Sequence, residues 1–139
     1  MLDNGGINTS GTIDAIALKS SLKKEEIAHI FNLRTELIFP LDQNVRLLPE
    51  LKKQGFKLFF LSNFPMDLFE EIKTDYYFFR YFDGGIISAE AKMSKPDIRF
   101  YDLLLKKYSL TAEECLYIDD LEINVRAAEA KGMKGLVTF

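Results

Sequence analysis

The sequence predicts an α/β domain built on a parallel β-sheet, and three observations support this prediction. From residue 56 onward, short apolar runs alternate with helix-like segments, a pattern that is typical of parallel sheets with right-handed crossovers. The run at 56–61 is apolar at nearly every position, as in strands that are buried on both faces. The chain has 139 residues, of which 47% are hydrophobic, and this composition suits one compact domain.

The N-terminal part of the sequence is predicted to be a loop followed by helix. Residues 1–11 are polar and rich in glycine, which is typical of a loop. Ser21 is expected to cap a helix that begins at Leu22. An apolar stripe at three- and four-residue spacing follows, made of Ile27, Ile30 and Phe31. We therefore divide the chain into an N-terminal region, residues 1–42, and an α/β core, residues 43–139.

The core is predicted to contain four strands with helical segments around them. The strands are expected at 56–61, 85–88, 115–118 and 136–139. The helical segments are expected at 44–55, in part of 66–82, from 96 onward and at 121–131. On the last helix we expect Ile123, Ala127 and Ala130 to face the sheet.

Polar residues stand at or near the ends of three of these strands. Ser62 and Asn63 follow the first strand, and Asp119 and Asp120 follow the third. Lys95 precedes a proline, which keeps it out of helical geometry and fixes it at a corner. Ligands of open α/β sheets bind at the carboxyl ends of the strands, so these residues are candidates for one site.

The chemistry of this set suits phosphoryl transfer. Phosphoryl oxygens are stabilised by hydrogen-bond donors, a lysine and a metal ion held by carboxylates. Each residue also has a purely structural explanation: Ser62 as a helix cap, Lys95 as a solvated side chain, and the two aspartates as acids at a helix start. The order and spacing of all three features favour a shared site.

These motifs resemble those of a known family, the haloacid dehalogenase-like hydrolases, and most closely its branch with small helical caps. The resemblance covers residues 43–139 and rests on three segments that resemble the second, third and fourth family motifs. They are Leu61-Ser62-Asn63, Ser94-Lys95-Pro96-Asp97, and Tyr117-Ile118-Asp119-Asp120 continuing through Asn124, Ala127, Ala128, Gly132 and Met133. The resemblance implies a three-layer Rossmann-like core, a partial helical cap within residues 1–42, and Mg²⁺-dependent phosphatase chemistry through an aspartyl-phosphate.

The same resemblance implies a role for each site residue. Ser62 would bind the phosphoryl group with Asn63 beside it, and Lys95 would steady the nucleophile and the phosphoryl charge. Asp120 would ligate Mg²⁺, with Asp119 next to it as a ligand or a supporting group. Asn124 would support these aspartates.

The family's first motif, an apolar strand that ends in Asp-x-Asp or Asp-x-Gly and supplies the nucleophilic aspartate, has no clear counterpart here. Asp3 begins an Asp-x-Gly-Gly segment but has only two residues before it. Asp42 follows an apolar run that Pro40 interrupts, and Asp14 lacks a preceding apolar strand. The candidate nucleophile is Asp3, the alternative is Asp42, and a third alternative is that the nucleophile is absent from this sequence.

The resemblance places that missing strand between the strands that end at Ser62 and at Asp119. Its absence would leave backbone groups unpaired on both neighbours, at a cost of roughly 1–3 kcal/mol for each buried group. Residues near Met1 or Leu37, a second chain, or a missing N-terminal segment of a longer protein could fill this slot, and we favour the last.

The predicted function is therefore a phosphatase-type hydrolase of a small phosphorylated metabolite. The alternative is a non-catalytic relative that binds Mg²⁺, a phosphorylated ligand or a partner subunit; a dehalogenase is a third reading. A phospho-accepting receiver domain is disfavoured because its acid pair belongs to the first strand.

The composition indicates which partners and which compartment we expect for the protein. The net charge of −3 gives no basic face for nucleic acid, and no apolar run is long enough to span a membrane. One cysteine, Cys115, fits a reducing, cytoplasmic location. The aromatic segment 76–82 could form the contact of a homo-oligomer.

Overall fold

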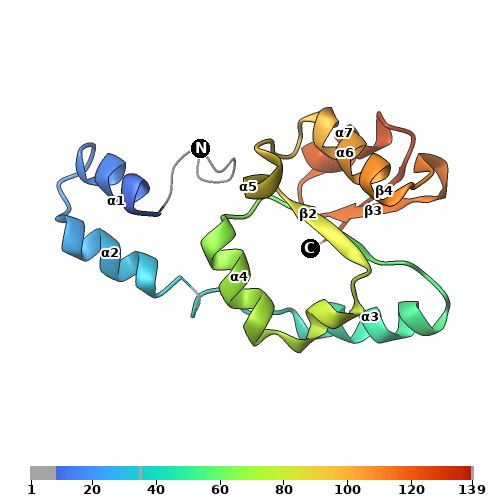
Figure 1. Ribbon diagram of the computed structural model, residues 1–139, viewed down its shortest axis with the longest axis horizontal. Helices are drawn as coiled ribbons and strands as arrows, with labels where there is room; N and C mark the ends of the chain where they lie inside the picture. Colours follow the sequence, from blue (N-terminus) through green and yellow to red (C-terminus); the bar gives the residue numbers. More distant parts are fainter. Residues whose placement is uncertain (1–8, 35, 139) are drawn as a thin grey trace.

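The chain runs from a pair of N-terminal helices into an α/β core, and the computed structural model describes residues 9–34 and 36–138 of it (Figure 1). The predicted nucleophile Asp3 lies outside the described residues. In chain order the elements are α1 (Thr9–Ala17), α2 (Lys24–Asn32), α3 (Asp42–Lys53), β1 (Phe59–Ser62), α4 (Met66–Asp75), η2 (Tyr77–Tyr81), β2 (Gly84–Ile87), α5 (Ser88–Ala91), α6 (Ile98–Tyr108), η3 (Ala112–Glu114), β3 (Leu116–Asp119), α7 (Glu122–Glu129) and β4 (Lys134–Val137).

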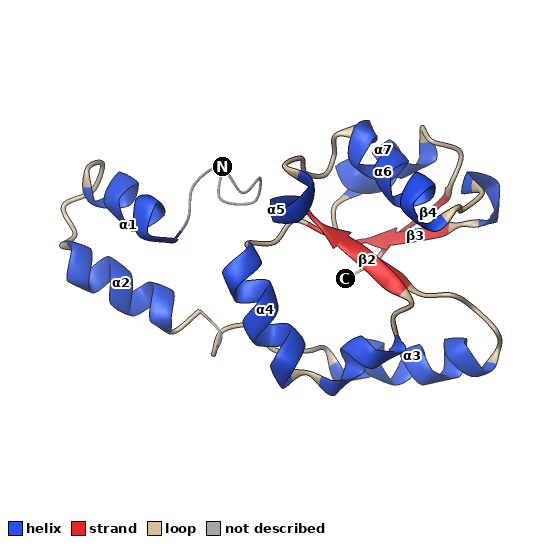
Figure 2. Ribbon diagram, viewed as in Figure 1, coloured by secondary structure: helices blue, strands red, loops and turns tan. Residues whose placement is uncertain are grey.

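The strands form two parallel pairs, as the alternating pattern predicts. Phe59 of β1 lies opposite Gly84 of β2, and Leu116 of β3 lies opposite Lys134 of β4. Within the described residues the pairs form two separate two-stranded sheets. Figure 2 shows the strands running between α6 and α7 on one side and α3 and α4 on the other. The α/β class of the core is thereby confirmed.

The core is buried in two clusters, one on each side of the strands. The larger cluster gathers around α6, where Phe100 and Tyr101 have no exposed surface. The smaller cluster joins β2 to α4 and contains Leu68, Phe69, Ile72 and Ile87. Apolar burial on both faces is what a parallel sheet with crossover helices requires.

The N-terminal helices α1 and α2 contact each other and lie to one side of the core (Figure 1). Ile27 is the buried anchor of α2, with 2% of its surface exposed. Arg34, just after α2, forms an ion pair with Asp67 of α4 at 2.8 Å and one with Glu71 at 3.6 Å. The helical pair is therefore tied to the core by charge.

Several expected details at helix starts and strand ends were wrong. The second helix begins at Lys24 instead of Leu22, because Lys23 is its N-cap and the Lys23 backbone N–H donates to the Glu26 carboxylate at 2.8 Å. Ile30 lies off the buried stripe and is 54% exposed. The first core strand begins three residues later than expected, at Phe59.

The inward face of α7 also differs from the expected one. Ile123 is 61% exposed, whereas Val125 and Ala128 are buried. The reason is Asn124, whose side chain donates to Asp119 at 2.9 Å and so turns the helix by one residue, about 100°.

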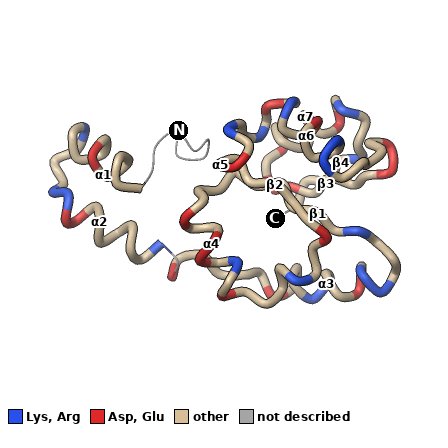
Figure 3. Tube along the Cα trace, viewed as in Figure 1, with Lys and Arg blue, Asp and Glu red and all other residues tan. Residues whose placement is uncertain are grey.

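No helix among residues 9–34 and 36–138 combines the length and the apolar content needed to cross a bilayer. Lysine and arginine are interspersed with aspartate and glutamate along the trace (Figure 3).

Candidate active site

The candidate site is centred on Asp119, the last residue of β3, whose side chain is only 5% exposed. Oxygen Oδ2 accepts hydrogen bonds from Lys95 Nζ and from the Tyr117 hydroxyl, both at 2.7 Å. Oxygen Oδ1 accepts from the Leu121 backbone N–H at 3.0 Å and from Asn124 Nδ2 at 2.9 Å. Four donors therefore fix this carboxylate in one orientation.

This environment keeps Asp119 ionised. Burial alone would raise the pKa of its carboxyl group, but the four donors, led by Lys95, outweigh burial and lower the pKa to about 2. Burial and the bond to Asp119 raise the pKa of Tyr117, so its hydroxyl stays protonated and donates. The site thus contains a fixed negative charge beside a fixed positive one.

Lys95 is held in place through its backbone as well as through its amine. The Lys95 N–H donates to Asn63 Oδ1 at 2.8 Å, and Asn63 Nδ2 donates to the Lys95 carbonyl at 3.1 Å. The Lys95–Pro96 peptide bond is cis. We call this paired contact the Asn63–Lys95 clasp; it joins the end of β1 to the loop before α6.

Ser62 lies at the end of β1, opposite Ile87 of β2, and is half-buried. Among the described residues its hydroxyl has no hydrogen-bond partner. It does not cap the next helix, because α4 begins at Met66 with Pro65 as its N-cap. The capping explanation is therefore wrong for Ser62, and its hydroxyl is available to a ligand.

Asp120 differs sharply from its neighbour Asp119. Its residue surface is exposed, and within residues 9–34 and 36–138 it makes no hydrogen bond or ion pair. The two adjacent carboxylates thus have different environments, since Asp119 accepts from four donors and Asp120 is open to solvent. The described part of the chain contains no group of three or more His, Cys, Asp or Glu residues suited to a metal ion.

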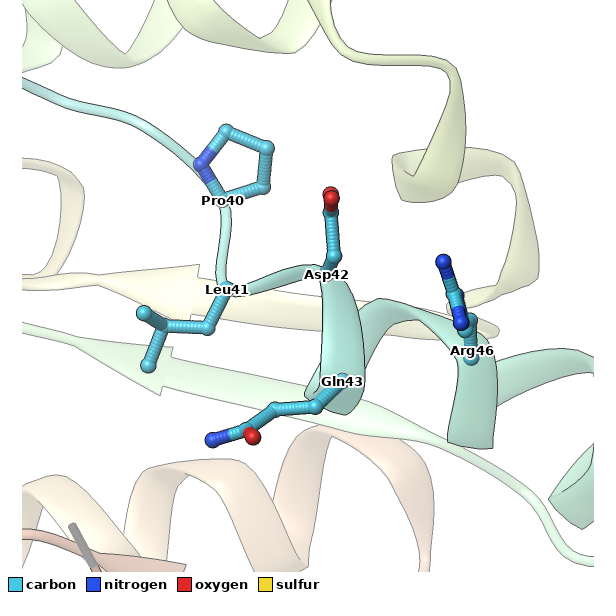
Figure 4. Close-up of a pocket in the computed structure, with 5 residues that line it drawn as sticks. All are labelled: Pro40, Leu41, Asp42, Gln43 and Arg46. Atoms are coloured by element: carbon cyan, nitrogen blue, oxygen red, sulfur yellow. The ribbon is translucent and has the colours of Figure 1, made fainter.

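The other two candidate nucleophiles, Asp42 and Asp14, lie away from Asp119. Asp42 is the first residue of α3 and lines a surface pocket with Pro40, Leu41, Gln43 and Arg46 (Figure 4). Asp14 pairs with Lys24 at 2.7 Å between α1 and α2. Neither forms a hydrogen bond or ion pair with the residues around Asp119 in the described chain.

Two residues that position the site were missed by sequence reasoning. Tyr117 stands two residues before Asp119, on the same face of the strand, and this spacing was the available signal. Ser88 is fully buried, and its hydroxyl accepts from the Phe64 N–H at 2.9 Å. It fixes the loop after Ser62, and no local sequence signal distinguishes it from an ordinary strand residue.

The fold and the site define an α/β domain with an anchored lysine–aspartate pair at the carboxyl ends of parallel strands. The chain belongs to the haloacid dehalogenase-like hydrolase family, whose model matches residues 6–138. The match therefore extends beyond the core into the N-terminal helices.

Two relatives of known name share substantial sequence with the chain. The sesquiterpene phosphatase astK of Aspergillus oryzae is 34% identical over 134 residues, which cover 96% of this chain and 68% of that protein. The glyceraldehyde 3-phosphate phosphatase of Methanocaldococcus jannaschii is 30% identical over 105 residues, which cover 73% of this chain and 45% of that protein. The chain thus spans only part of the length of each relative.

Solved structures confirm the fold. A haloacid dehalogenase family enzyme from Bacteroides thetaiotaomicron, in complex with magnesium and inorganic phosphate, superposes with a TM-score of 0.81 at 19% identity. The match covers 98% of this chain and 72% of that enzyme. A hydrolase of the same type from Porphyromonas gingivalis gives a TM-score of 0.77 at 17% identity, covering 98% of this chain and 69% of that one.

Proposed function

We propose that this chain acts as a phosphatase-type hydrolase that removes the phosphoryl group from a small phosphorylated metabolite, with Mg²⁺ as cofactor and an aspartyl-phosphate as intermediate. The observation that carries the proposal is the Lys95–Asp119 pair at 2.7 Å, held in place by the Asn63–Lys95 clasp. A lysine fixed by a buried carboxylate and by its own backbone is preorganised for an anion. Family membership and the names of two phosphatase relatives support the same class of reaction.

Each site residue has a part in this proposal. Lys95 would neutralise phosphoryl charge. The Ser62 hydroxyl, which has no partner among the described residues, would donate to a phosphoryl oxygen. Asn63 would act through Lys95 by holding its backbone, which refines the expectation that it flanks the phosphoryl group. Asn124 would keep Asp119 in place.

The residues fit a magnesium ion. Mg²⁺ typically uses one or two carboxylates, keeps several waters and takes its remaining ligands from substrate phosphate. The exposed Asp120 would be the protein ligand, and Asp119 would support it, since both Asp119 oxygens already accept hydrogen bonds. When bound, the ion would offset charge on the phosphoryl oxygens.

The proposed reaction needs a nucleophilic carboxylate, and Asp3 is the proposed residue. The alternative from the sequence, Asp42, begins α3 and forms no hydrogen bond or ion pair with Lys95 or Asp119 among the described residues. A carboxylate oxygen would bond to phosphorus while the bond from phosphorus to the ester oxygen breaks, and the leaving oxygen would take a proton from solvent. Water would then hydrolyse the acyl phosphate, releasing inorganic phosphate and restoring the carboxylate.

The second candidate is a non-catalytic domain that binds Mg²⁺ or a phosphorylated ligand. One observation favours it: Asp119 is the only carboxylate among the described residues that pairs with Lys95. No described residue therefore stands in the nucleophile's place beside that lysine.

Hydrolysis of p-nitrophenyl phosphate, glyceraldehyde 3-phosphate and a sesquiterpene monophosphate by the purified chain separates the two candidates. Metal-dependent turnover that Asp3→Asn or Asp42→Asn abolishes would support the hydrolase and identify its nucleophile. Asp75→Asn, an exposed change at the end of α4, is the matched control. A folded chain that binds phosphate, measured by ³¹P NMR, but turns over none of these esters would support the binding domain.

A further inference from the structure

Tyr101, in the first turn of α6, is a fully buried tyrosine whose hydroxyl bonds to another helix. The hydroxyl donates to the Asn124 carbonyl of α7 at 2.9 Å. In an α-helix an interior carbonyl accepts from the N–H four residues later, so the Asn124 carbonyl has a helical partner in Ala128 without the tyrosine. The bond from Tyr101 is therefore additional to what α7 itself needs.

A phenylalanine would fill this buried position without a hydroxyl. Burying a hydroxyl costs free energy that its hydrogen bond roughly offsets. The neighbouring Phe100 shows that the same core accepts a phenyl ring with no exposed surface. The reason for the Tyr101 hydroxyl therefore lies in what it connects.

The bond connects the two elements that carry the ion pair of the candidate site. Lys95 stands three residues before the first residue of α6, so its position follows that of this helix. On the other side, the Asn124 side chain donates to Asp119 Oδ1 at 2.9 Å. Helices α6 and α7 lie together on one side of the strands (Figure 2), and Tyr101 is bonded across them.

These contacts form a closed ring around the ion pair. From Lys95 the chain enters α6 and reaches Tyr101, whose hydroxyl bonds to Asn124. Asn124 bonds to Asp119, and Asp119 accepts from Lys95 Nζ at 2.7 Å. Because hydrogen bonds weaken steeply with misalignment, the separation of α6 from α7 affects the contact between Lys95 and Asp119. The hydroxyl of Tyr101 is the link of this ring that joins the two helices.

Tyr117 gives Tyr101 a second route to the same carboxylate. The two rings meet edge to face, with centroids 5.3 Å apart and an interplanar angle of 71°. The Tyr117 hydroxyl donates to the Asp119 oxygen that also accepts from Lys95. Since protein interiors are close-packed, a displaced Tyr101 ring would move Tyr117 and disturb this second donor.

We propose that Tyr101 is a positioning residue that aligns Lys95 with Asp119, acting through Asn124 and Tyr117. A lysine kept in a fixed place and orientation is what a preorganised anion site requires. The use of this alignment in phosphoryl transfer rests on the proposed function, whereas the alignment itself does not.

The test compares Tyr101→Phe with Tyr108→Phe, a matched change at the other end of the same helix. The Tyr108 hydroxyl also bonds to backbone groups, at the outer edge of β2. It accepts from the Gly85 N–H at 2.8 Å and donates to the Gly85 carbonyl at 2.9 Å. Each variant removes one hydrogen-bonded hydroxyl from α6, but only Tyr101 belongs to the ring around the ion pair.

The measurement is NMR of the purified full chain without added metal, which records the scalar coupling across the hydrogen bond from Lys95 Nζ to the Asp119 carboxyl carbon. The wild type and Tyr108→Phe will show this coupling, and Tyr101→Phe will lose it. Amide signals of Lys134–Val137 report that each chain is folded. In hydrolysis of p-nitrophenyl phosphate, Tyr101→Phe will lower kcat by about tenfold and change KM by less than about twofold, because misalignment weakens transition-state contacts most.

Coupling that persists in Tyr101→Phe would overturn the proposal, and so would its absence from the wild type or an unchanged kcat in an active variant. Loss of the coupling in both variants would mean that any loosening of α6 breaks the ion pair. Unfolding of Tyr101→Phe alone would mean that its hydroxyl serves only stability, and both of these results also overturn the alignment role. A wild type that shows the expected couplings but hydrolyses no phosphate ester would contradict the proposed function and leave the alignment supported.

Discussion

At the scale of single residues, the site depends on Asp119 remaining ionised inside the protein. Its carboxylate has four hydrogen-bond donors and a pKa of about 2, below the usual value of about 3.9. A group whose pKa is lower in the folded chain contributes stability above its unfolded pKa and loses it as the pH falls through its folded pKa. This contribution is therefore full above about pH 5 and disappears between about pH 4 and pH 2.

We predict that Asp119→Asn lowers the unfolding free energy at pH 7 by about 2–4 kcal/mol, because it leaves the Lys95 amine buried without a counter-charge. The difference between variant and wild type will shrink between pH 4 and pH 2, in urea titrations without magnesium. Asp102→Asn, which breaks the more exposed pair with Lys131, should cost less than about 1 kcal/mol. A difference that does not depend on pH would contradict the lowered pKa.

Asp120 allows a complementary prediction, because it is exposed and has no partner in the described chain. Asp120→Asn should change the unfolding free energy by less than about 0.5 kcal/mol. We also expect magnesium and phosphate to raise the melting temperature of the wild type and to have no such effect on Asp120→Asn. Thermal unfolding with and without these two additives measures both effects. Glu122→Gln, an exposed change in the next turn, should keep the ligand-induced rise. Loss of that rise in Glu122→Gln as well would argue against Asp120 as the metal ligand.

At the scale of elements, the Tyr108 contact closes the outer edge of β2. A Cβ added to Gly84 would lie 2.5 Å from the Tyr108 ring, so the glycine lets this side chain reach the strand. We predict that Tyr108→Phe lowers the unfolding free energy by about 2–3 kcal/mol, because two backbone groups of Gly85 lose their partner. Urea unfolding measures the loss. Tyr77→Phe, at a residue that is 64% exposed, should stay within about 0.5 kcal/mol, and an equal effect of both changes would contradict the edge role.

The order of strands and helices could be predicted because it depends on local hydrophobic pattern, as at Leu116–Asp119 and Ile98–Tyr108. The strand ends and helix faces were predicted less accurately where a hydrogen bond to a residue of another element determines them. Asn124 turns α7 toward Asp119, and no periodicity of apolar residues contains that information. The first core strand was predicted to begin too early, at Phe56, which lies outside the sheet and is 55% exposed.

The site was predictable to the extent that its residues follow strands. Ser62, Lys95 and Asp119 come from distant parts of the sequence, and the structure brings Lys95 to Asp119 at 2.7 Å. Tyr117 and Ser88 were missed because their roles depend on which face and loop they meet in three dimensions. The nucleophile stays a prediction, because Asp3 lies outside the described residues.

At the scale of the whole molecule, Arg34 links the N-terminal helices to the core. Arg34 donates to Asp67 at 2.8 Å and to Thr9 at 3.0 Å, and Thr9 also donates to Asp67. The Arg34 side chain is only 20% exposed, whereas its partner Asp67 is 46% exposed, so the cation is better shielded from solvent than in most surface pairs. It joins the start of α1 and the end of α2 to the first turn of α4.

We predict that Arg34→Met loosens α1 and α2 from the core without unfolding the core, because the apolar stem is kept and only the charge is lost. Amide exchange in Lys24–Asn32 will become faster by about fivefold or more, whereas exchange in Ile98–Tyr108 will not change. Arg126→Met, which breaks an exposed pair within α7, is the control and should leave both helices unchanged. Equal acceleration in both helices would mean that Arg34 supports global stability, and no acceleration would mean that Ile27 and its apolar contacts hold the helices in place.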